Sequence, residues 1–198
     1  PRLGEISGLR QIVNVSAQSV TGHDLKDGHE IWRYSWPGAQ PKCTDPTLLA
    51  NDRILLSAGY SLGGVLLQLQ KLADGHWKIS ELWKSRQLKT RFMNPVIHEG
   101  RIFGFDDGIL CCVDLQSGKT LWRKGRYGHG QMLLVRDLLL IVAENGDLAL
   151  VRAAGDAYQE LHRRPALNGK TWNTLALSGN LLLIRNAEEA ICYELATE

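Results

Sequence analysis

Apolar and polar residues alternate in short runs along the whole chain, and turn-forming residues separate the runs. Residues 101–122, "RIFGFDDGILCCVDLQSGKTLW", show two apolar runs joined by Asp-Asp-Gly and then a Ser-Gly turn that leads to Trp122. Alternation with a period of two is typical of strands with one buried face, and Asp-Gly and Ser-Gly suit tight hairpins. No window of the sequence shows helical periodicity, so the pattern predicts an all-β fold.

The turn followed by a tryptophan is repeated. The matching stretches are "DLKDGHEIW" ending at Trp32, "KLADGHWKISELW" ending at Trp83 and "DLQSGKTLW" ending at Trp122. Trp122 follows Trp83 by 39 residues, and 39 more lead to Leu161, where a leucine is predicted to replace the tryptophan. Periods near 40 residues with four short strands each predict a β-propeller of four-stranded antiparallel blades.

The repeat predicts four full blades and a fifth that stops after its third strand. The approximate blade bounds are 1–36, 46–88, 91–128, 131–165 and 172–198. In the third blade the expected strands are 94–99, 101–106, 109–115 and 120–125. Each fourth-strand tryptophan should wedge between adjacent blades, which gives Trp32, Trp83 and Trp122 a structural role.

The first strand of blade one already uses residues 1–9, so they are not available to complete the last blade. We therefore expect a partial ring that the chain does not close alone. It would be the C-terminal part of a longer propeller of seven or eight blades, or a protomer whose ring a second copy completes.

Two units, "IFGFDDGILCCVDLQSGKTLWRKG" and "VTGHDLKDGHEIWRYSWPG", resemble the pyrroloquinoline-quinone-like propeller repeat. The shared features are an apolar strand, a glycine, an apolar strand ending in Asp, and a glycine turn before the tryptophan. Among such proteins the chain resembles outer-membrane-assembly-type propellers, many of which are not enzymes. The resemblance implies a bacterial protein that is periplasmic or secreted, although the sequence shows no signal peptide. It defines a fold more sharply than a function.

Composition excludes several classes. A net charge of +2 without a basic stripe gives no reason to expect nucleic-acid binding, and no apolar run is long enough for a transmembrane segment. The four cysteines stand at no metal-ligand spacing, so no metal site is predicted.

Polar residues recur where each innermost strand should begin. A carboxylate or an amide stands just before the strand in four units, at Asp45, Asn94, Gln131 and Asn173. Three positions earlier the residues are Lys42, Arg91, Gly128 and Lys170, of which three are basic. In a propeller these positions surround the mouth of the central channel, where they could bind an anion or a polar peptide. Alternatively, they cap the strands by hydrogen bonding to exposed backbone.

The Gly-His-Gly stretch around His129 connects an outer strand to the next inner strand, and its glycines allow the sharp turn. The imidazole should project toward the channel mouth beside Arg91, Lys170 and Trp172. Trp172 also precedes an inner strand, so its ring could stack on a flat ligand or simply plug the channel. For His129, a binding role and a purely structural role both remain open.

The functional alternatives are a scaffold and an enzyme. The resemblance implies that, in a quinoprotein dehydrogenase, a pair such as Cys111-Cys112 would form a disulfide that packs against the cofactor. Here the pair lies within a predicted strand, so we expect it to pack in the core. No catalytic residue can be assigned. We therefore predict a non-catalytic scaffold, without a cofactor, for a protein, a peptide or a small anionic ligand. The alternative is a fragment of a quinone-dependent dehydrogenase, which would need pyrroloquinoline quinone and calcium.

Overall fold

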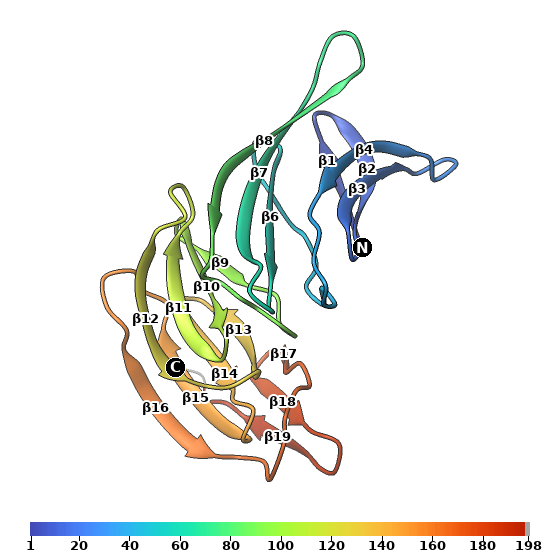
Figure 1. Cartoon of the computed structure of the whole chain (residues 1–198). Coiled ribbons are helices and arrows are strands. Elements are labelled where there is room, and N and C mark those ends of the chain that lie inside the picture. The colour runs from blue at the N-terminus through green and yellow to red at the C-terminus, as the bar shows by residue number, and fades with distance from the viewer. Residues whose placement is uncertain (197–198) are drawn as a thin grey trace. The chain divides into compact units, whose positions relative to one another are not determined.

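The computed structural model describes residues 1–196, in which 19 strands form five antiparallel sheets. The chain divides into two compact units, Pro1–Asn94 and Pro95–Glu198 (Figure 1). Two sheets belong to the first unit and three to the second. Within each sheet the strands follow one another in sequence order, as in a propeller blade.

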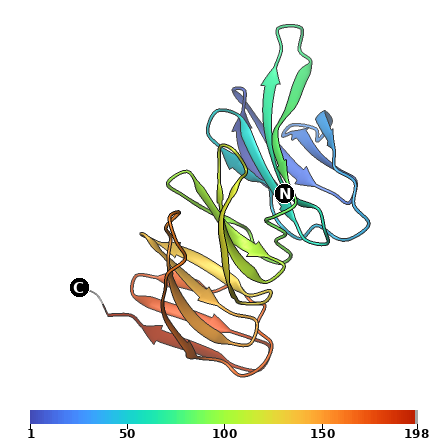
Figure 2. The same ribbon diagram turned by 60° about the vertical axis from the view of Figure 1, so that its left-hand side comes forward.

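The first unit contains two four-stranded sheets. One consists of β1 (Arg2–Ile6), β2 (Leu9–Val15), β3 (Ser19–Asp24) and β4 (Glu30–Ser35). The other consists of β5 (Thr47–Leu49), β6 (Arg53–Ala58), β7 (Gly63–Lys71) and β8 (Trp77–Ser85). The β7–β8 hairpin extends beyond the other strands of its sheet, as both ribbon views show (Figures 1 and 2).

The second unit contains two four-stranded sheets and one of three strands. The first of them consists of β9 (Val96–His98), β10 (Arg101–Asp106), β11 (Ile109–Asp114) and β12 (Thr120–Arg126). The next consists of β13 (Gln131–Val135), β14 (Leu138–Val142), β15 (Asp147–Arg152) and β16 (Glu160–Pro165). The last consists of β17 (Ala176–Ser178), β18 (Leu181–Arg185) and β19 (Ala190–Glu194).

This arrangement confirms the predicted all-β fold with four full sheets and an incomplete fifth. In the third sheet the strands agree with the expected ranges to within two residues at either end. Its central hairpin turns at Asp107 and Gly108, whose φ angles are 49° and 84°. Both values lie in the left-handed region that a two-residue hairpin requires, which explains the Asp-Gly pair.

The fourth strand of each full sheet contains the same β-bulge, and it corrects one prediction. At this bulge the ladder skips one residue, which is Ile31, Leu82, Leu121 or Leu161 in the four sheets. The β11–β12 ladder has a second shift between Ile109 and Cys111. The residue after the bulge faces the third strand, and these residues are Trp32, Trp83, Trp122 and His162. The prediction that Leu161 replaces the tryptophan was therefore wrong, because the loop of residues 153–159 is two residues longer than the matching loop of the third sheet, 115–119. His162 occupies the tryptophan position and is exposed.

In the first unit Trp32 packs one sheet against the next. Its side chain is 4% exposed, and its indole N–H donates to the Gln11 side-chain oxygen at 2.5 Å. Gly22 faces Trp32 in the ladder, and any side chain at Gly22 would collide with the indole. On its other side Trp32 meets the ring of Trp77, from β8 of the neighbouring sheet, at a centroid distance of 6.5 Å. The tryptophan thus contributes to the contact between sheets.

In the second unit Trp122 makes the corresponding contacts. Its ring lies 5.7 Å from that of Tyr158 in the neighbouring sheet's β15–β16 loop, and its indole N–H donates to the Ala154 carbonyl at 2.9 Å. The following sheets join through apolar side chains of β14, β18 and β19, among them Val142, Leu182 and Ile191.

A partly buried polar network also joins the third and fourth sheets. Glu160 accepts hydrogen bonds from the hydroxyls of Tyr127 and Tyr158 and from Arg163, the latter two at 2.8 Å. The guanidinium of Arg163 lies 4.4 Å from the centre of the Tyr127 ring. Partial burial would raise the pKa of Glu160, but hydrogen bonds from Arg163 and the tyrosines lower it. The Glu160 carboxylate therefore stays ionised, and its charge is paired with that of Arg163.

Cys111 and Cys112 are free thiols in the interior of β11. Both are buried, and Cys112 faces Phe103 on one side and Trp122 on the other. Burial raises the pKa of the Cys112 thiol to about 12, so the thiol is protonated at neutral pH. The pair packs in the core as expected.

Replacing Trp32 with alanine should lower the free energy of unfolding by about 3–5 kcal/mol, because it empties a core position between two sheets. Chemical denaturation followed by far-ultraviolet circular dichroism measures this without relying on tryptophan fluorescence. The matched control is Leu82→Ala in the same unit, where the bulge residue is 49% exposed. Leu82→Ala should change stability by no more than about 0.5 kcal/mol. Equal effects of the two substitutions would contradict the assigned role of Trp32.

Candidate functional site

Three segments of the second unit meet at Glu144. They are the connection between the third and fourth sheets (127–130), the β14–β15 turn (143–146), and the connection between the fourth and fifth sheets (166–175). Glu144 lies in the turn, and both its main chain and its side chain contact the two connections.

The contacts of Glu144 are directional. One carboxylate oxygen accepts the main-chain N–H of His129 at 3.0 Å, and the other accepts the indole N–H of Trp172 at 2.8 Å. The main-chain N–H of Glu144 donates to the Tyr127 carbonyl, and its own carbonyl accepts the Thr171 N–H, both at 2.8 Å. One residue thus binds each connection twice.

The environment keeps Glu144 ionised. Partial burial would raise its pKa, but the hydrogen bonds from His129 and Trp172 and the electrostatic influence of the nearby His129 and Lys170 side chains lower it. Gly128 makes the close approach possible: its φ is +60°, and a Cβ there would collide with the Glu144 side chain. The Gly-His-Gly stretch is therefore a corner whose geometry Glu144 requires.

Side chains around Glu144 complete this cluster. The ammonium of Lys170 lies 4.5 Å from the centre of the Trp172 ring, and that tryptophan is 41% exposed. The buried Gln131 amide donates to the Trp172 carbonyl at 3.1 Å. We call the cluster of His129, Gln131, Glu144, Lys170 and Trp172 the Glu144 site. It brings together four residues that the sequence singled out.

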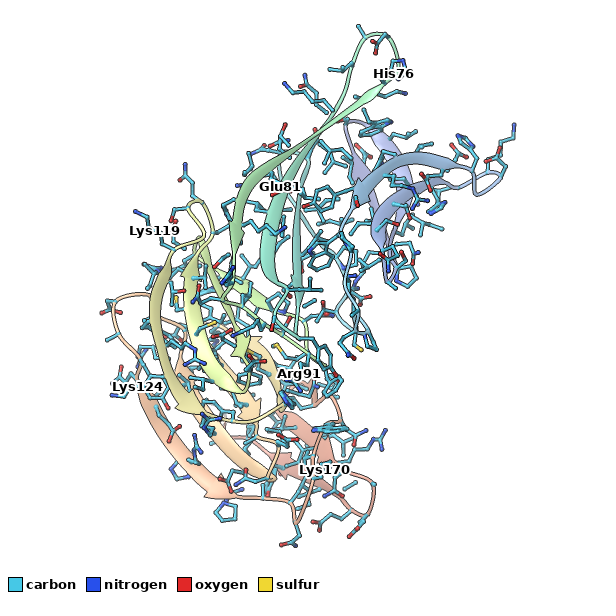
Figure 3. All side chains as sticks on the ribbon, in the orientation of Figure 1. His76, Glu81, Arg91, Lys119, Lys124 and Lys170 are labelled. Atoms are coloured by element: carbon cyan, nitrogen blue, oxygen red, sulfur yellow. The ribbon has the colours of Figure 1, made fainter. Side chains whose placement is uncertain are left out.

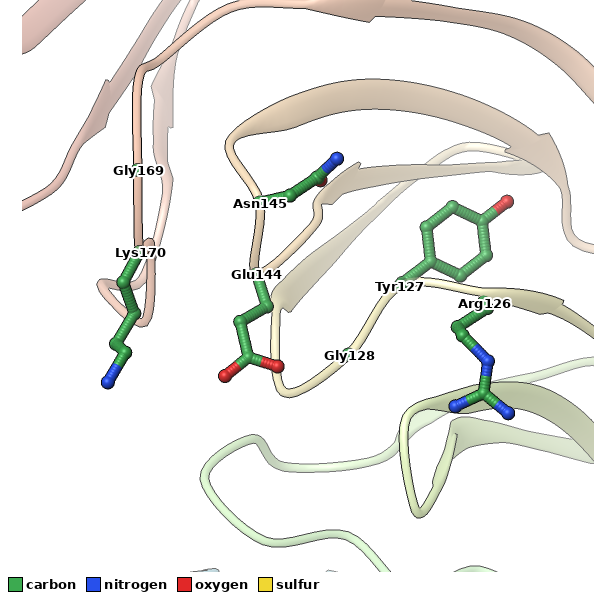
Figure 4. Close-up of a pocket in the computed structure, with 7 residues that line it drawn as sticks. All are labelled: Arg126, Tyr127, Gly128, Glu144, Asn145, Gly169 and Lys170. Atoms are coloured by element: carbon green, nitrogen blue, oxygen red, sulfur yellow. The ribbon is translucent and has the colours of Figure 1, made fainter.

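A pocket with a volume of about 610 Å³ adjoins the Glu144 site. Its lining residues are Arg126, Tyr127, Gly128, Glu144, Asn145, Gly169 and Lys170 (Figure 4). The side chains of Arg126, Glu144 and Lys170 extend from the loops in the same general direction, with Glu144 between the two basic residues. The pocket thus contains two cationic groups and one carboxylate.

Three other predicted residues lie in the first unit, namely Asp45, Arg91 and Asn94, whereas Asn173 lies in the second. The Asn94 side-chain oxygen accepts the main-chain N–H of Asp45 at 2.8 Å, and Asp45 forms an ion pair with Arg2 at 3.3 Å. The guanidinium carbon of Arg91, a residue labelled in Figure 3, lies 4.5 Å from the centre of the Tyr60 ring. The partners in these contacts are a main-chain N–H, an arginine and an aromatic ring of the protein itself. Such contacts are expected of residues that fix the start of a strand.

Strand register corrects the alignment at the fifth sheet. Counted back from the hairpins that close the inner strands, the equivalents of Asp45 are Asn94, Gln131 and Thr174. Asn173 therefore stands one residue out of line, and Lys170 is likewise displaced by one. The connection of residues 166–175 contains no Gly-His-Gly or Asn-Pro pair that could have anchored the alignment.

Sequence reasoning missed Glu144 and Arg126. Glu144 belongs to a hairpin turn, "AENGD", and nothing in that stretch marks it as a partner of two distant connections. Arg126 sits at the end of an outer strand, where basic residues are common on exposed edges. Only the approach of three segments in space identifies these two residues.

A second cluster was also unforeseen. Ligand atoms of Asp24, Asp27 and His29 lie within 4.8 Å of one another in the β3–β4 turn. The carboxylate of Asp27 accepts both the main-chain N–H of His29, at 3.0 Å, and its ring nitrogen, at 2.6 Å. These hydrogen bonds raise the pKa of His29 and lower that of Asp27. They account for the cluster as a turn motif.

Calcium, which the dehydrogenase alternative needs, takes six to eight oxygen ligands. In the first unit, the Asp45–Asn94 pair offers one carboxylate, which is paired with Arg2, and one amide oxygen that already accepts a hydrogen bond. In the Glu144 site each carboxylate oxygen likewise has a donor. Neither group fits a calcium ion.

Glu144→Gln should lower the free energy of unfolding by about 1–2 kcal/mol at pH 7, because hydrogen bonds to a charged acceptor weaken. The lowered pKa means that the carboxylate's stabilisation is complete above its ordinary value of 4.5 and is lost as pH falls through the lowered pKa. The stability difference between wild type and variant should therefore shrink as the pH falls below 4.5 through the lowered pKa of Glu144.

Denaturant titrations at several pH values measure this difference. Glu99→Gln is the control in the same unit and should cost under about 0.5 kcal/mol, since Glu99 is 69% exposed and forms ion pairs with His98 at 4.0 Å and Arg101 at 3.5 Å. If the difference in unfolding free energy between wild type and Glu144→Gln stays constant from pH 7 to pH 3, the charge of Glu144 does not contribute to stability.

Comparisons with known proteins agree with this fold. Residues 5–160 match the family described as outer membrane protein assembly factor BamB. A search among curated proteins finds no significant match. Among solved structures, BamB from Moraxella catarrhalis superposes with a TM-score of 0.58 at 13% sequence identity. That superposition covers 92% of this chain and 66% of the Moraxella protein, so the chain spans just under two thirds of its relative.

The N-terminal domain of Nup159 is also similar, with a TM-score of 0.56, 10% identity, and coverage of 88% of this chain and 49% of that one. At such identities the structural likeness establishes the fold alone, which is a β-propeller built of PQQ-like repeats. Residues 1–196 form no helix long and apolar enough to cross a bilayer. Because the family match extends over most of its length, the chain belongs to the family of the outer-membrane assembly factor BamB.

Proposed function

We propose that the chain is a non-catalytic scaffold that binds polypeptide partners during the assembly of outer-membrane proteins. The observation that carries the proposal is the family match over residues 5–160. A propeller suits this task because rigid sheets present loops whose sequence can vary without disturbing the core. The proposal places the protein in the bacterial periplasm, beside the outer membrane, and requires neither a quinone nor a metal.

The Glu144 site is the surface that we assign to partner binding. Trp172 presents an aromatic ring that is 41% exposed, and aromatic side chains dominate the energetics of protein interfaces. Hydrogen bonds donated to Glu144 hold its indole and the neighbouring connection, so little side-chain freedom is lost when a partner binds. We also propose that this polar, basic surface is the channel mouth expected from the sequence. Completion of the ring, by further blades or by a second copy, remains a prediction.

The chemistry of Glu144 favours a scaffold over an enzyme. A general base needs a carboxylate that can accept a proton from a substrate. Both oxygens of Glu144 already accept hydrogen bonds, and their donors lower its pKa. The residue is therefore better suited to hold loops in place than to exchange protons.

Photocrosslinking in bacterial cells that export the chain tests the proposal. Benzoylphenylalanine at position 172 should crosslink to proteins of outer-membrane assembly, identified by mass spectrometry. The control places the same photocrosslinker at Leu121, on β12 of the same unit, which is 47% exposed. Position 121 should give few crosslinks. The absence of polypeptide crosslinks at position 172, or the same set at both positions, would refute binding through the Glu144 site.

A further inference from the structure

We infer that copies of this chain associate head to tail, with the fifth sheet (β17–β19) of one copy packed on the first sheet (β1–β4) of the next. Each of these two sheets has one face with exposed apolar side chains, which we call its open face. The open face of the fifth sheet contains Leu181, Leu183 and Cys192, and that of the first sheet contains Leu3 and Ile12. The inference goes beyond the proposed function, because it concerns association of the chain with itself and not the partner at the Glu144 site.

The fifth sheet has one covered face and one open face. Along β18 the side chains alternate: Leu182 and Ile184 are 0% and 1% exposed, whereas Leu181 and Leu183 are 48% and 45% exposed. The buried pair packs on the fourth sheet, which lies beside β17–β19 within the second unit (Figure 2). On β19 the open face continues with Cys192, an exposed thiol that faces Leu183 in the ladder. Apolar side chains of two strands therefore lie together on a face that contacts water.

Strand register shows what covers the equivalent face of the fourth sheet. Counted from the hairpin between the first and second strands, Leu183 corresponds to Leu140. Leu140 is only 9% exposed, because it packs in one core cluster with Leu182 and Ile184 of the following sheet. A face of this kind is thus covered by the opposite face of another sheet of the same type, and the fifth sheet lacks that cover within residues 1–196.

The first sheet offers the opposite face. By the same count, Ile12 of β2 corresponds to Ile184, which packs on the preceding sheet. Ile12 is 38% exposed, and Leu3, which faces it in the ladder, is 55% exposed. The alternate residues Gln11 and Val13 are fully buried on the other face of the sheet. The first sheet therefore exposes the half of the junction that the fifth sheet lacks.

Charged side chains do not oppose contact between the two open faces. Arg10 and Glu5 face each other across β1 and β2 on the first sheet. On the fifth sheet the open face carries Arg185 at the end of β18 and Glu194 on β19. Each face thus has one positive and one negative group, so neither repels the other by net charge, and opposite charges are available for pairing.

A second copy fits as the partner because the chain itself carries both halves of the junction. Apolar surface is stabilised when it leaves water, and the terminal units of stacked repeats need a polar outer face to stay soluble. Neither terminal sheet meets this need, since both expose leucine side chains. The two open faces differ, so the contact is heterologous: each copy offers its fifth sheet to one neighbour and its first sheet to another.

Sedimentation equilibrium of the full chain tests the inference. The mass of the wild type should rise with protein concentration to that of two chains or more. Two double variants each block one open face: Leu181→Arg/Leu183→Arg on the fifth sheet and Leu3→Arg/Ile12→Arg on the first. Either variant alone should raise the Kd of association at least about tenfold, because the contact would bury unpaired arginines. The replaced side chains are exposed in the single chain, so both variants should fold, as circular dichroism would verify.

A mixture of the two variants gives the sharpest result. One variant retains an intact first sheet and the other an intact fifth sheet, so together they should form a 1:1 dimer and no larger species. The matched control is Leu25→Arg/Leu72→Arg, which replaces leucines that are 45% and 37% exposed and lie in turns of the first unit. This control should associate like the wild type.

Three results would overturn the inference: a wild type that stays monomeric at about 1 mM, a mixture of the variants that stays monomeric, or equal losses in the control. Dimers of one variant alone would also contradict it, since they require a contact between identical faces. Photocrosslinking from position 172 reports on the proposed function separately. If that position crosslinks to assembly proteins while the chain stays monomeric, the scaffold function stands and head-to-tail association is refuted.

Discussion

A four-stranded sheet cannot bury its own faces, so every sheet of this chain depends on the sheet beside it. The fourth-strand tryptophans supply part of that contact. Trp32 meets Trp77 of the next sheet, and Trp122 meets Tyr158 in the same way. A bulge precedes each tryptophan and sets the residue that faces the third strand. In the repeats of Trp32 and Trp122, packing of neighbouring sheets is therefore encoded locally, in one turn, one bulge and one large side chain.

The Glu144 site depends on the same packing. Its three segments come from successive sheets, and they meet only because those sheets are pressed together by the apolar contacts of the second unit. Glu144 then fixes the positions of both connections through four hydrogen bonds, and Gly128 leaves room for its side chain. A surface arranged in this way suits recognition, since its groups are positioned before a partner arrives.

The sequence predicted the fold well because the repeat combines two independent signals. Alternation fixed the strands, and the turn with its tryptophan fixed the repeat length, so the strands of the third sheet were located to within two residues. The errors arose where spacing was counted through loops. Leu161 was assigned for His162, and Asn173 for Thr174, since connections can gain or lose a residue without disturbing the ladder.

The candidate site was predictable only in part. His129, Gln131, Lys170 and Trp172 were found because they stand at corresponding positions of the repeat. Glu144 and Arg126 stand at positions that the repeat does not mark, and their roles depend on contacts between segments that are distant in sequence. An alignment of repeats identifies residues at positions that all repeats share, whereas a binding surface can depend on residues that occur in one repeat alone.

Amide hydrogen exchange at His129 and Thr171 tests the central claim most directly, namely that Glu144 holds the two connections as a preformed surface. Both residues lie outside the strands, and both amides donate to Glu144. Slow exchange of these two amides in the free protein is the result that the account predicts. Exchange at the rate of an unprotected chain would show that the connections are not held, and would contradict the account.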